Sequence, residues 1–386
     1  MSDLSEKTMS VLGSTGSVGK QALDVAREHG IKVYGITCAK GIGAAEEQIR
    51  EFSPRVCAVL DEKAASDLRA RVSDTGCRVT CGKDAICEVA SAAQNDVVVN
   101  SITGVAGLMP SVAVIRSGKR LALANKETIV TAGKLVMSLA KERGCEILPV
   151  DSEHSAIFQS IGANVKKDIE RIILTASGGP FFGKKREELK DITPQMALAH
   201  PTWNMGPKIT VDSASLMNKG FEVIEAVHLF GVKPSMVDVV VHRESIIHSL
   251  VEYTDKAVLA QLSYPDMRLC VRYAVSYPER TASSLRPLDL ASIGTLTFAK
   301  PDVETFSLLS LAYYVAGHPD TTLGATLNGA NERAVELFLN GKIGFTDIFD
   351  LVERVVRNSP ELPLTFENVF EADAAAREDI DKLSLS

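Results

Sequence analysis

The sequence predicts an α/β protein with an N-terminal doubly wound parallel sheet, a central α+β domain and a C-terminal helical bundle. Short β-rich runs alternate with helical stretches over the first 150 residues. After residue 151 the strands cluster, and from about residue 303 apolar residues recur only at helical spacing. We therefore expect a first domain at 1–150, a central domain at 151–276, a linker at 277–302 and a helical domain at 303–386.

The first 150 residues set the fold class. "TMSVLG" leads through a glycine-rich turn to the helical "GKQALDVAREHG", and "KVYGITC" is the next strand. Further strands are expected at "VCAVL", "NDVVVNSI", "RLALAN" and "EILPV", each separated by helical or turn-rich sequence. Because parallel strands need crossover connections, which are mostly helices, this alternation is typical of a Rossmann-like sheet.

The central segment has a different pattern. "RIILTAS", "MVDVVVH", "HSLVEYT" and "AVLAQLSY" are expected to form a mixed or antiparallel sheet around helices near 155–162 and 214–230. A proline-containing stretch with little periodicity then predicts the linker. Beyond it, helical spacing continues, with two final helical runs near 346–357 and 367–382.

Composition excludes several classes of protein. The 42 Lys and Arg residues face 49 Asp and Glu residues, for a net charge of -7 without a basic block, so nucleic acid is not an expected partner. The N-terminal residues lack an apolar signal segment and no run is long enough to cross a bilayer, so no membrane association is expected. Seven cysteines without C-x-x-C spacing are typical of reduced thiols, which favours a cytoplasmic location.

The stretch "VLGSTGSVGKQAL" predicts a nucleotide site. Gly13, Gly16 and Gly19 lie where a strand gives way to a helix, so backbone N–H groups and the helix N-terminus can face a phosphate. The spacing is G-x-x-G-x-x-G, which departs from the common dinucleotide pattern, and a tight turn without a ligand is the alternative. The next strand ends in Lys40 and not in an acidic residue, which favours NADP over NAD unless Lys40 is only a surface lysine.

"LALANKETIV" places three polar residues after an apolar strand, namely Asn125, Lys126 and Glu127. The carboxyl ends of parallel strands face the ligand crevice, so the three are candidates for cofactor or substrate contacts. The alternative is a helix start with solvated charges. A Schiff-base role for Lys126 is disfavoured because nothing nearby in sequence suggests an apolar pocket.

"LPVDSEHSAIF" contains the strongest candidate for a catalytic or metal-binding site. If the strand continued to its end, Asp151 and Glu153 would project from one face, because side chains alternate along a strand. Two adjacent carboxylates require a metal ion, a shared proton or open water, and hard oxygen ligands suit Mg²⁺ or Mn²⁺. An exposed pair, or a helix capped by Asp151 or Ser152, is the alternative.

A further carboxylate lies in "VDSASLMNKGFEVIEAVHLF". Here Asp212, Ser213 and Ser215 are expected to cap a helix that presents a polar face. That face carries Asn218, Lys219 and Glu222. Donors at a helix start suit a phosphate monoester, whereas an amphipathic surface helix is the alternative.

Two glycine- and proline-bounded turns complete the candidate site. Ser177 opens the donor-rich turn of "LTASGGPFF". "LAHPTWNMGPKI" contains a loop from His200 to Gly206 with the single tryptophan, Trp203, which is either a lid or an interface anchor.

The chain carries six motifs in a fixed order, namely "GSTGSVG", "LANKE", "VDSEHSAIFQ", "ASGGPF", "HPTWNMGPKITVDSASLMNKGFEVIEA" and "YPDMR". With these motifs it resembles the 1-deoxy-D-xylulose 5-phosphate reductoisomerase family over nearly its whole length. The resemblance implies reduction of a phosphorylated sugar with NADPH and Mg²⁺ or Mn²⁺. It also implies a homodimer. The product would be 2-C-methyl-D-erythritol 4-phosphate, a precursor in non-mevalonate isoprenoid biosynthesis.

The resemblance also implies roles for individual residues. The metal ligands would be Asp151, Glu153 and Glu222. The NADPH contacts would be Thr15, Gly16, Ser17, Val18, Asn125, Glu127 and Gly206. The substrate would meet Lys126, Ser152, Ser177, His200, Ser213, Asn218 and Lys219, together with the metal ligands Glu153 and Glu222. His154 would orient or protonate the substrate.

One stretch departs from the family. Many members have Gly-Lys-Asn after the second strand, where this chain has Ala39, Lys40 and Gly41. The resemblance implies that these three residues also contact NADPH, on its adenosine side, although glycine at position 41 offers no side chain. Two other functions remain open at this point. A simple NADP-dependent dehydrogenase would need no metal, and a catalytically inactive nucleotide sensor would use the carboxylates only for structure.

Overall fold

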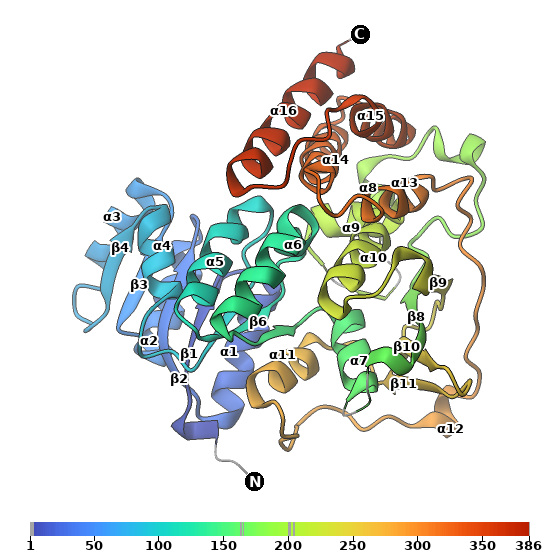
Figure 1. The fold of residues 1–386 in the computed structure, drawn as a ribbon. Helices are drawn as coiled ribbons and strands as arrows, with labels where there is room; N and C mark the ends of the chain where they lie inside the picture. The colour runs from blue at the N-terminus through green and yellow to red at the C-terminus, as the bar shows by residue number, and fades with distance from the viewer. Residues whose placement is uncertain (1–3, 163, 165, 200–201, 204, 386) are drawn as a thin grey trace. The chain divides into compact units, whose positions relative to one another are not determined.

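The computed structural model describes residues 4–162, 164, 166–199, 202–203 and 205–385 (Figure 1). The chain forms two compact units and passes between them more than once. The first unit comprises Met1–Thr128, Ser138–Ser155 and Asp266–Leu285. The second comprises Ile129–Met137, Ala156–Pro265 and Arg286–Ser386. The sequence predicted domains that are each one continuous range of residues, and those domain boundaries remain predictions.

The first unit is built on a seven-stranded sheet in which every neighbouring pair is parallel, in the order β4-β3-β2-β1-β5-β6-β7. Its strands are β1 Thr8–Leu12, β2 Lys32–Cys38, β3 Val56–Val59, β4 Arg78–Cys81, β5 Val97–Asn100, β6 Arg120–Leu123 and β7 Ile147–Pro149. Strands β3 and β5 are valine-rich and buried along their whole length, as expected when helices cover both faces of a parallel sheet. The predicted doubly wound sheet is confirmed, although β4 was not predicted.

Helices connect these strands, and one further helix of this unit comes from later in the chain. The connecting helices are α1 Ser17–His29, α2 Ile42–Phe52, α3 Glu62–Arg71, α4 Lys83–Ala90, α5 Leu108–Arg116 and α6 Lys126–Arg143, and the later helix is α11 Met267–Ser276. Helix α1 packs against α11, and α4 packs against α5. Helix α6 contributes its first and last residues to this unit and its middle to the second unit.

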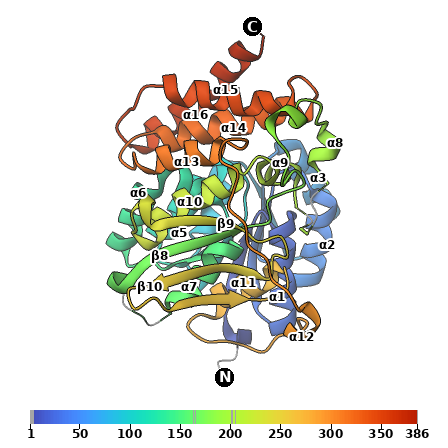
Figure 2. The same ribbon diagram turned by 90° about the vertical axis from the view of Figure 1, so that its right-hand side faces the viewer.

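The second unit contains a four-stranded mixed sheet in the order β11-β10-β8-β9 (Figure 2). Its strands are β8 Ile169–Ala176, β9 Val237–Val241, β10 Ile247–Tyr253 and β11 Val258–Leu262. Only β8 and β9 run parallel, and the other neighbours are antiparallel, so the predicted mixed sheet is confirmed. The helices between β7 and β9 in the chain are α7 Ser152–Ile161, α8 Pro194–Ala197, α9 Pro207–Ala214 and α10 Met217–Phe230, and α10 contacts β8 and β9.

The chain ends in the predicted helical bundle, which also belongs to the second unit (Figure 2). Its helices are α13 Leu308–Ala316, α14 Leu323–Leu339, α15 Phe345–Asn358 and α16 Phe366–Ser384. Phe338, Phe345 and Phe349 form a cluster of fully buried rings with edge-to-face contacts, which supplies much of the apolar area that holds the bundle together.

Short helical turns complete the fold. They are α12 Leu290–Ile293 and the 3₁₀ helices η1 Leu4–Glu6, η2 Val105–Gly107, η3 Lys166–Asp168, η4 Arg186–Leu189 and η5 Pro234–Met236. Among the described residues, no helix combines the length and the apolar character needed to cross a membrane.

Candidate active site

The glycine-rich turn between β1 and α1 is fixed by the neighbouring strand and helix. The Gly13 N–H donates to the Thr37 hydroxyl at 2.9 Å, and the Ser14 hydroxyl donates to the side-chain oxygen of Gln48 at 2.7 Å. The Gln48 amide nitrogen returns a hydrogen bond to the Ser14 carbonyl at 2.9 Å. A Cβ atom at Gly19 would lie 2.3 Å from the Gly13 carbonyl oxygen, so only glycine lets α1 pack this closely on the turn.

The end of β2 lies beside this turn. Gly41 is the N-cap of α2, and a Cβ atom built on it would lie 3.1 Å from the Thr15 hydroxyl oxygen. The Lys40 side chain is 80% exposed, and its ammonium lies 3.8 Å from the Asp61 carboxylate. Surface pairs of this kind contribute little to stability, which leaves Lys40 available to a ligand. The predicted cofactor residues Thr15, Lys40 and Gly41 are therefore close together.

Asn125, Lys126 and Glu127 lie where α6 begins, at the carboxyl end of β6. The Asn125 side-chain oxygen caps the helix by accepting from the Thr128 N–H at 2.9 Å, and its amide group donates to the Glu127 carboxylate at 2.7 Å. Lys126 is 8% exposed and forms an ion pair with Asp151. The alternative of solvated charges at a helix start is wrong, because all three side chains are buried.

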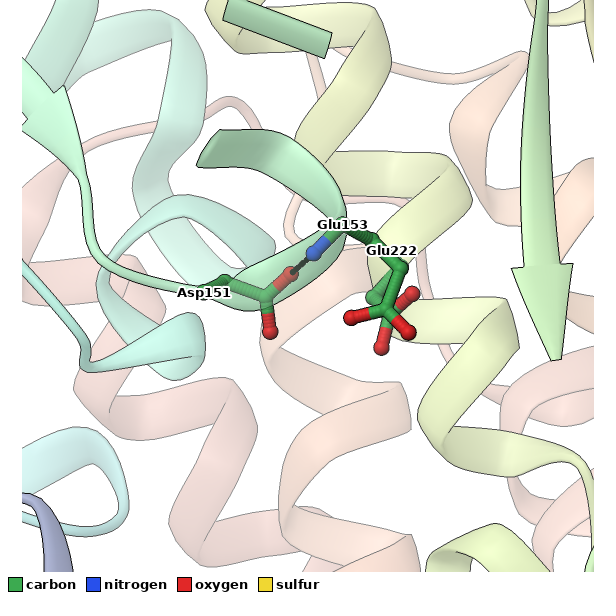
Figure 3. A group of neighbouring side chains, drawn as sticks. All are labelled: Asp151, Glu153 and Glu222. Atoms are coloured by element: carbon green, nitrogen blue, oxygen red, sulfur yellow. Dashed lines mark hydrogen bonds between the residues drawn. The ribbon is translucent and has the colours of Figure 1, made fainter. Parts of the chain in front are cut away.

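The first two carboxylates do not share the face of a strand, so that part of the prediction is wrong. Strand β7 ends at Pro149 and α7 begins at Ser152, with Asp151 directly before its first residue. The Asp151 Oδ1 atom accepts from the Glu153 N–H group (Figure 3) and from the His154 N–H group, at 3.2 Å each, which is a helix-capping arrangement. The alternative prediction for this segment, a helix capped by Asp151, is therefore confirmed.

The three predicted metal ligands nevertheless converge. One oxygen from each of Asp151, Glu153 and Glu222 lies within 4.8 Å of the others (Figure 3). Burial by itself would raise the pKa of Asp151, but the Lys126 ammonium and the hydrogen-bonded His154 ring outweigh it and hold that pKa well below the usual range. An ionised cluster of hard oxygen atoms suits Mg²⁺ or Mn²⁺ and not a thiol-seeking metal.

Glu222 comes from α10, whose start differs from the prediction. Leu216, with a left-handed φ of 60°, is the N-cap of α10, whereas Asp212 and Ser213 lie in the last turn of α9. Glu222 is 1% exposed, accepts from the Asn218 amide at 2.7 Å and forms an ion pair with Lys219. Because Lys219 is also buried, the alternative of an amphipathic surface helix is wrong.

Two further predicted groups meet in the second unit. Gly179, in the turn after β8, has φ of 63°, and a Cβ atom there would lie 2.8 Å from the Ser213 carbonyl oxygen. Its N–H donates to the Ser177 hydroxyl at 3.3 Å, so the turn that begins at Ser177 packs directly on the end of α9. Further along the chain, Gly206 is the N-cap of α9.

The ring of Trp203 contacts the ring of His248 edge to face, with centroids 6.2 Å apart. The predicted substrate residue His200 lies outside the described residues.

Comparison with known proteins identifies the family. Profiles described as 1-deoxy-D-xylulose 5-phosphate reductoisomerase match residues 9–133 and, for its C-terminal domain, 147–230, and a DXP reductoisomerase C-terminal domain profile matches 262–379. The protein of that name from Acetivibrio thermocellus is 50% identical over 376 residues, which are 97% of this chain and 98% of the relative. The one from Prosthecochloris aestuarii is 49% identical over 382 residues, 98% of this chain and 100% of the relative.

The chain belongs to the 1-deoxy-D-xylulose 5-phosphate reductoisomerase family.

Solved structures of reductoisomerases have the same fold. The Zymomonas mobilis reductoisomerase in complex with NADPH aligns with a TM-score of 0.92 at 37% identity, covering 98% of this chain and 99% of that one. A DOX-P reductoisomerase in complex with NADPH, fosmidomycin and magnesium gives the same TM-score, identity and coverage.

Residues that hold this reductoisomerase site in place were not predicted. Thr37 and Gln48 fix the glycine-rich turn, and Asp212, expected to be a cap, is a buried ion-pair partner. A glutamine within a helical run carries no local signal for such a contact. Its partner Ser14 lies 34 residues away in the chain, so only the fold brings them together.

Proposed function

We propose that this protein converts 1-deoxy-D-xylulose 5-phosphate and NADPH to 2-C-methyl-D-erythritol 4-phosphate in a reaction that requires Mg²⁺ or Mn²⁺. The observation that carries the proposal is the convergence of Asp151, Glu153 and Glu222 within 4.8 Å in a chain of the reductoisomerase family. A simple dehydrogenase of a sugar phosphate has no need of three carboxylates at one point.

The metal would be held by these three carboxylates. Lys126 and Lys219 each pair with one of them, so two positive charges face three negative ones before a divalent cation binds. When bound, such a cation polarises the ketone and lowers the pKa of an adjacent hydroxyl, which allows the carbon skeleton to rearrange. His154 is fully buried with Nδ1 at 2.9 Å from Asp151, so its role would be to orient that ligand.

Lys126 and Ser152 would bind the substrate hydroxyls. Both are buried at the start of a helix, α6 for Lys126 and α7 for Ser152. Lys126 pairs with the predicted metal ligand Asp151, and Ser152 follows Asp151 in the chain. An ammonium and a hydroxyl can donate hydrogen bonds to the sugar while the carboxylates accept them. These two side chains would fix the orientation of the carbon chain relative to the metal ligands.

The substrate phosphate would lie among Ser177, Ser213, Asn218 and Lys219, with His200 from the preceding loop. The turn that begins at Ser177 packs on the backbone of Ser213, and Asn218 and Lys219 follow in the first turn of α10. Hydroxyl, amide and ammonium donors are the groups that phosphate oxygens accept from. Because the phosphate is remote from the bonds that change, its binding energy is available for positioning and for excluding water.

NADPH would bind at the glycine-rich turn. Thr15, Gly16, Ser17 and Val18 lie at the start of α1, where N–H groups and the helix dipole favour the pyrophosphate. Ala39, Lys40 and Gly41 would face the adenosine 2′-phosphate, with the exposed Lys40 ammonium as the charge partner. Asn125, Glu127 and Gly206 would complete the cofactor contacts.

We also propose that the protein is a homodimer in the cytoplasm. Strand β11 is an edge of the four-stranded sheet, and its residues Val258 and Leu259 are 46% and 44% exposed. An exposed apolar edge strand is avoided in monomers, so a second copy is a suitable cover for it.

The direct test follows the absorbance of NADPH with 1-deoxy-D-xylulose 5-phosphate as substrate. We expect oxidation that a chelator abolishes and that Mn²⁺ or Mg²⁺ restores, and loss of turnover in Glu222→Gln. The 2-C-methyl-D-erythritol 4-phosphate product is identified by mass spectrometry. Turnover that persists in the chelator would support a metal-independent dehydrogenase, and absence of turnover with either metal would overturn the assignment.

A further inference from the structure

A buried carboxylate, Asp212, and its partner Lys208 link three helices of the second unit. Asp212 on α9 is 1% exposed, and one of its carboxylate oxygens lies 2.9 Å from the ammonium of Lys208, one turn earlier on the same helix. Its other oxygen accepts from the Asn331 amide of α14 at 2.8 Å. The Lys208 ammonium also lies 4.7 Å from the centre of the buried Phe221 ring of α10. Both carboxylate oxygens are therefore engaged by groups on two different helices.

This cluster lies at the junction between α9 and α10. The Asp212 carbonyl accepts from the Ser215 hydroxyl at 3.2 Å, and that hydroxyl also accepts from the Met217 N–H at 3.4 Å. Between them, Leu216 holds a left-handed φ of 60°, a conformation that non-glycine residues adopt only when the surrounding structure enforces it. The two hydrogen bonds of the Ser215 hydroxyl span this residue and connect it to the Asp212 backbone.

The proposed ligand contacts are the chain neighbours of this cluster. Ser213 follows Asp212, and Glu222 follows Phe221. Asn218 and Lys219 begin one residue after Met217. A shift of the α9 end relative to α14 would therefore move donors on both sides of the junction.

We propose that Asp212 is a positioning residue for substrate phosphate binding. Its carboxylate, fixed by Asn331 and Lys208, holds the α9–α10 junction in the one conformation that directs the Ser213 hydroxyl and the Asn218 and Lys219 donors at a phosphate monoester. Asp212 itself does not touch the ligand. The inference takes the identity of the substrate from the proposed function. The anion site at the junction does not depend on that function.

The same helix provides a matched control. Asn328 lies one turn before Asn331 on α14, and its amide donates at 2.9 Å to Asp373, which is also buried and paired with a cation, Arg377. This second Asn–Asp contact leads to α16 and not to α9. Asn331→Ser and Asn328→Ser therefore remove similar buried hydrogen bonds, but only the first loosens the junction.

The test measures phosphate binding apart from catalysis. Inorganic phosphate is titrated into the full-length metal-loaded protein while the emission of Trp203, the single tryptophan, is followed. KM values for 1-deoxy-D-xylulose 5-phosphate and for NADPH are measured on the same variants. For Asn331→Ser we expect weaker phosphate binding and a higher KM for the sugar phosphate, each by about tenfold, or about 1.4 kcal/mol. The KM for NADPH should stay unchanged, and Asn328→Ser should keep wild-type values for all three.

If Asn331→Ser fails to fold, Lys208→Met is the second variant, because Lys208 is 31% exposed. We expect the same weakening of phosphate binding and the same rise in the KM for the sugar phosphate. Wild-type phosphate affinity in the folded variants, with only a lower melting temperature, would reduce Asp212 to a structural role and overturn the proposal. An equal loss in Asn328→Ser would also overturn it, because the effect would then be general to the bundle. If the wild-type protein has no turnover, the proposed function fails, but the phosphate titration still decides the role of Asp212.

Discussion

Replacing Glu153 with glutamine should make the protein more stable than the wild type without metal and less stable than the wild type with saturating metal. The variant keeps the shape of the side chain but removes one charge from a cluster whose oxygens lie within 4.8 Å of one another. At an effective dielectric constant of about 20, each carboxylate pair at that distance repels by about 3.5 kcal/mol. Attraction to the nearby lysines and to the α7 dipole is lost as well, so we expect a net stabilisation of about 1–3 kcal/mol without metal.

With metal the order changes. A ligand at 100 times its dissociation constant stabilises the folded protein by about 2.7 kcal/mol. Glu153→Gln leaves two carboxylates, so its metal affinity is lower and it gains less of this energy. We therefore expect the variant to melt above the wild-type protein in a chelating buffer and below it in saturating Mn²⁺. The size of the shift should be about 2–4 °C for each kcal/mol, as for domains of 150–250 residues.

Scanning calorimetry at constant ionic strength measures both states. Glu62→Gln is the matched control, because Glu62 is also an acidic residue in the first turn of a helix, α3, but is exposed. It should lose a few tenths of a kcal/mol equally in both buffers. If Glu153→Gln were less stable than the wild-type protein in the chelator, the carboxylates would not repel one another and the charge argument would be refuted.

Two further predictions concern the cofactor turn and pH. Gly19→Ala should weaken NADPH binding at least about tenfold in a fluorescence titration, because its Cβ atom would lie 2.3 Å from the Gly13 carbonyl oxygen. Gly43→Ala is the control and should bind NADPH normally, because a Cβ atom at Gly43 has open space around it. Equal NADPH affinity in the two variants would contradict this prediction. Burial lowers the pKa of His228 from 6.5 to about 4, so the unfolded chain takes up the proton first and stability is lost as pH falls from 6.5 towards 4, by up to about 3 kcal/mol. His228→Gln should flatten the fall in melting temperature between pH 7 and pH 5 and His318→Gln should not, and an unchanged slope in His228→Gln would show that the histidine is not the cause.

The sheet of the first unit was predictable because its pattern is local. Buried runs such as the valines of β5 alternate with helices, and that alternation leaves few topologies. Strand β4 was missed because its four residues, "RVTC", include only one buried side chain. It is a strand because it pairs with β3, and such a long-range contact leaves no trace in a short polar segment.

The three carboxylates chosen as candidate metal ligands lie together, but the sequence argument for two of them was wrong. The alternation argument for Asp151 and Glu153 assumed that β7 continued, whereas an aspartate followed by serine and glutamate is also a strong helix start. Local sequence could not decide between the two, since each explains an apolar run ending in acids. Glu222 lies 69 residues after Glu153 in the chain, so the family resemblance and not the spacing placed it beside the other two.

The buried lysines explain how the cluster is ready for a metal near neutral pH. Three carboxylates brought together without compensation would raise each other's pKa values, and protons would compete with the metal. The ion pair with Lys126 and the hydrogen bond from His154 instead keep the pKa of Asp151 well below its usual range, although burial opposes them. Its ionised form is therefore favoured above the unfolded pKa of about 3.9 and is lost only as pH falls through the lower folded value. It follows that protonation of Asp151 does not limit metal binding between pH 7 and pH 5. Any loss of metal affinity as the pH falls through this range must therefore arise from other groups.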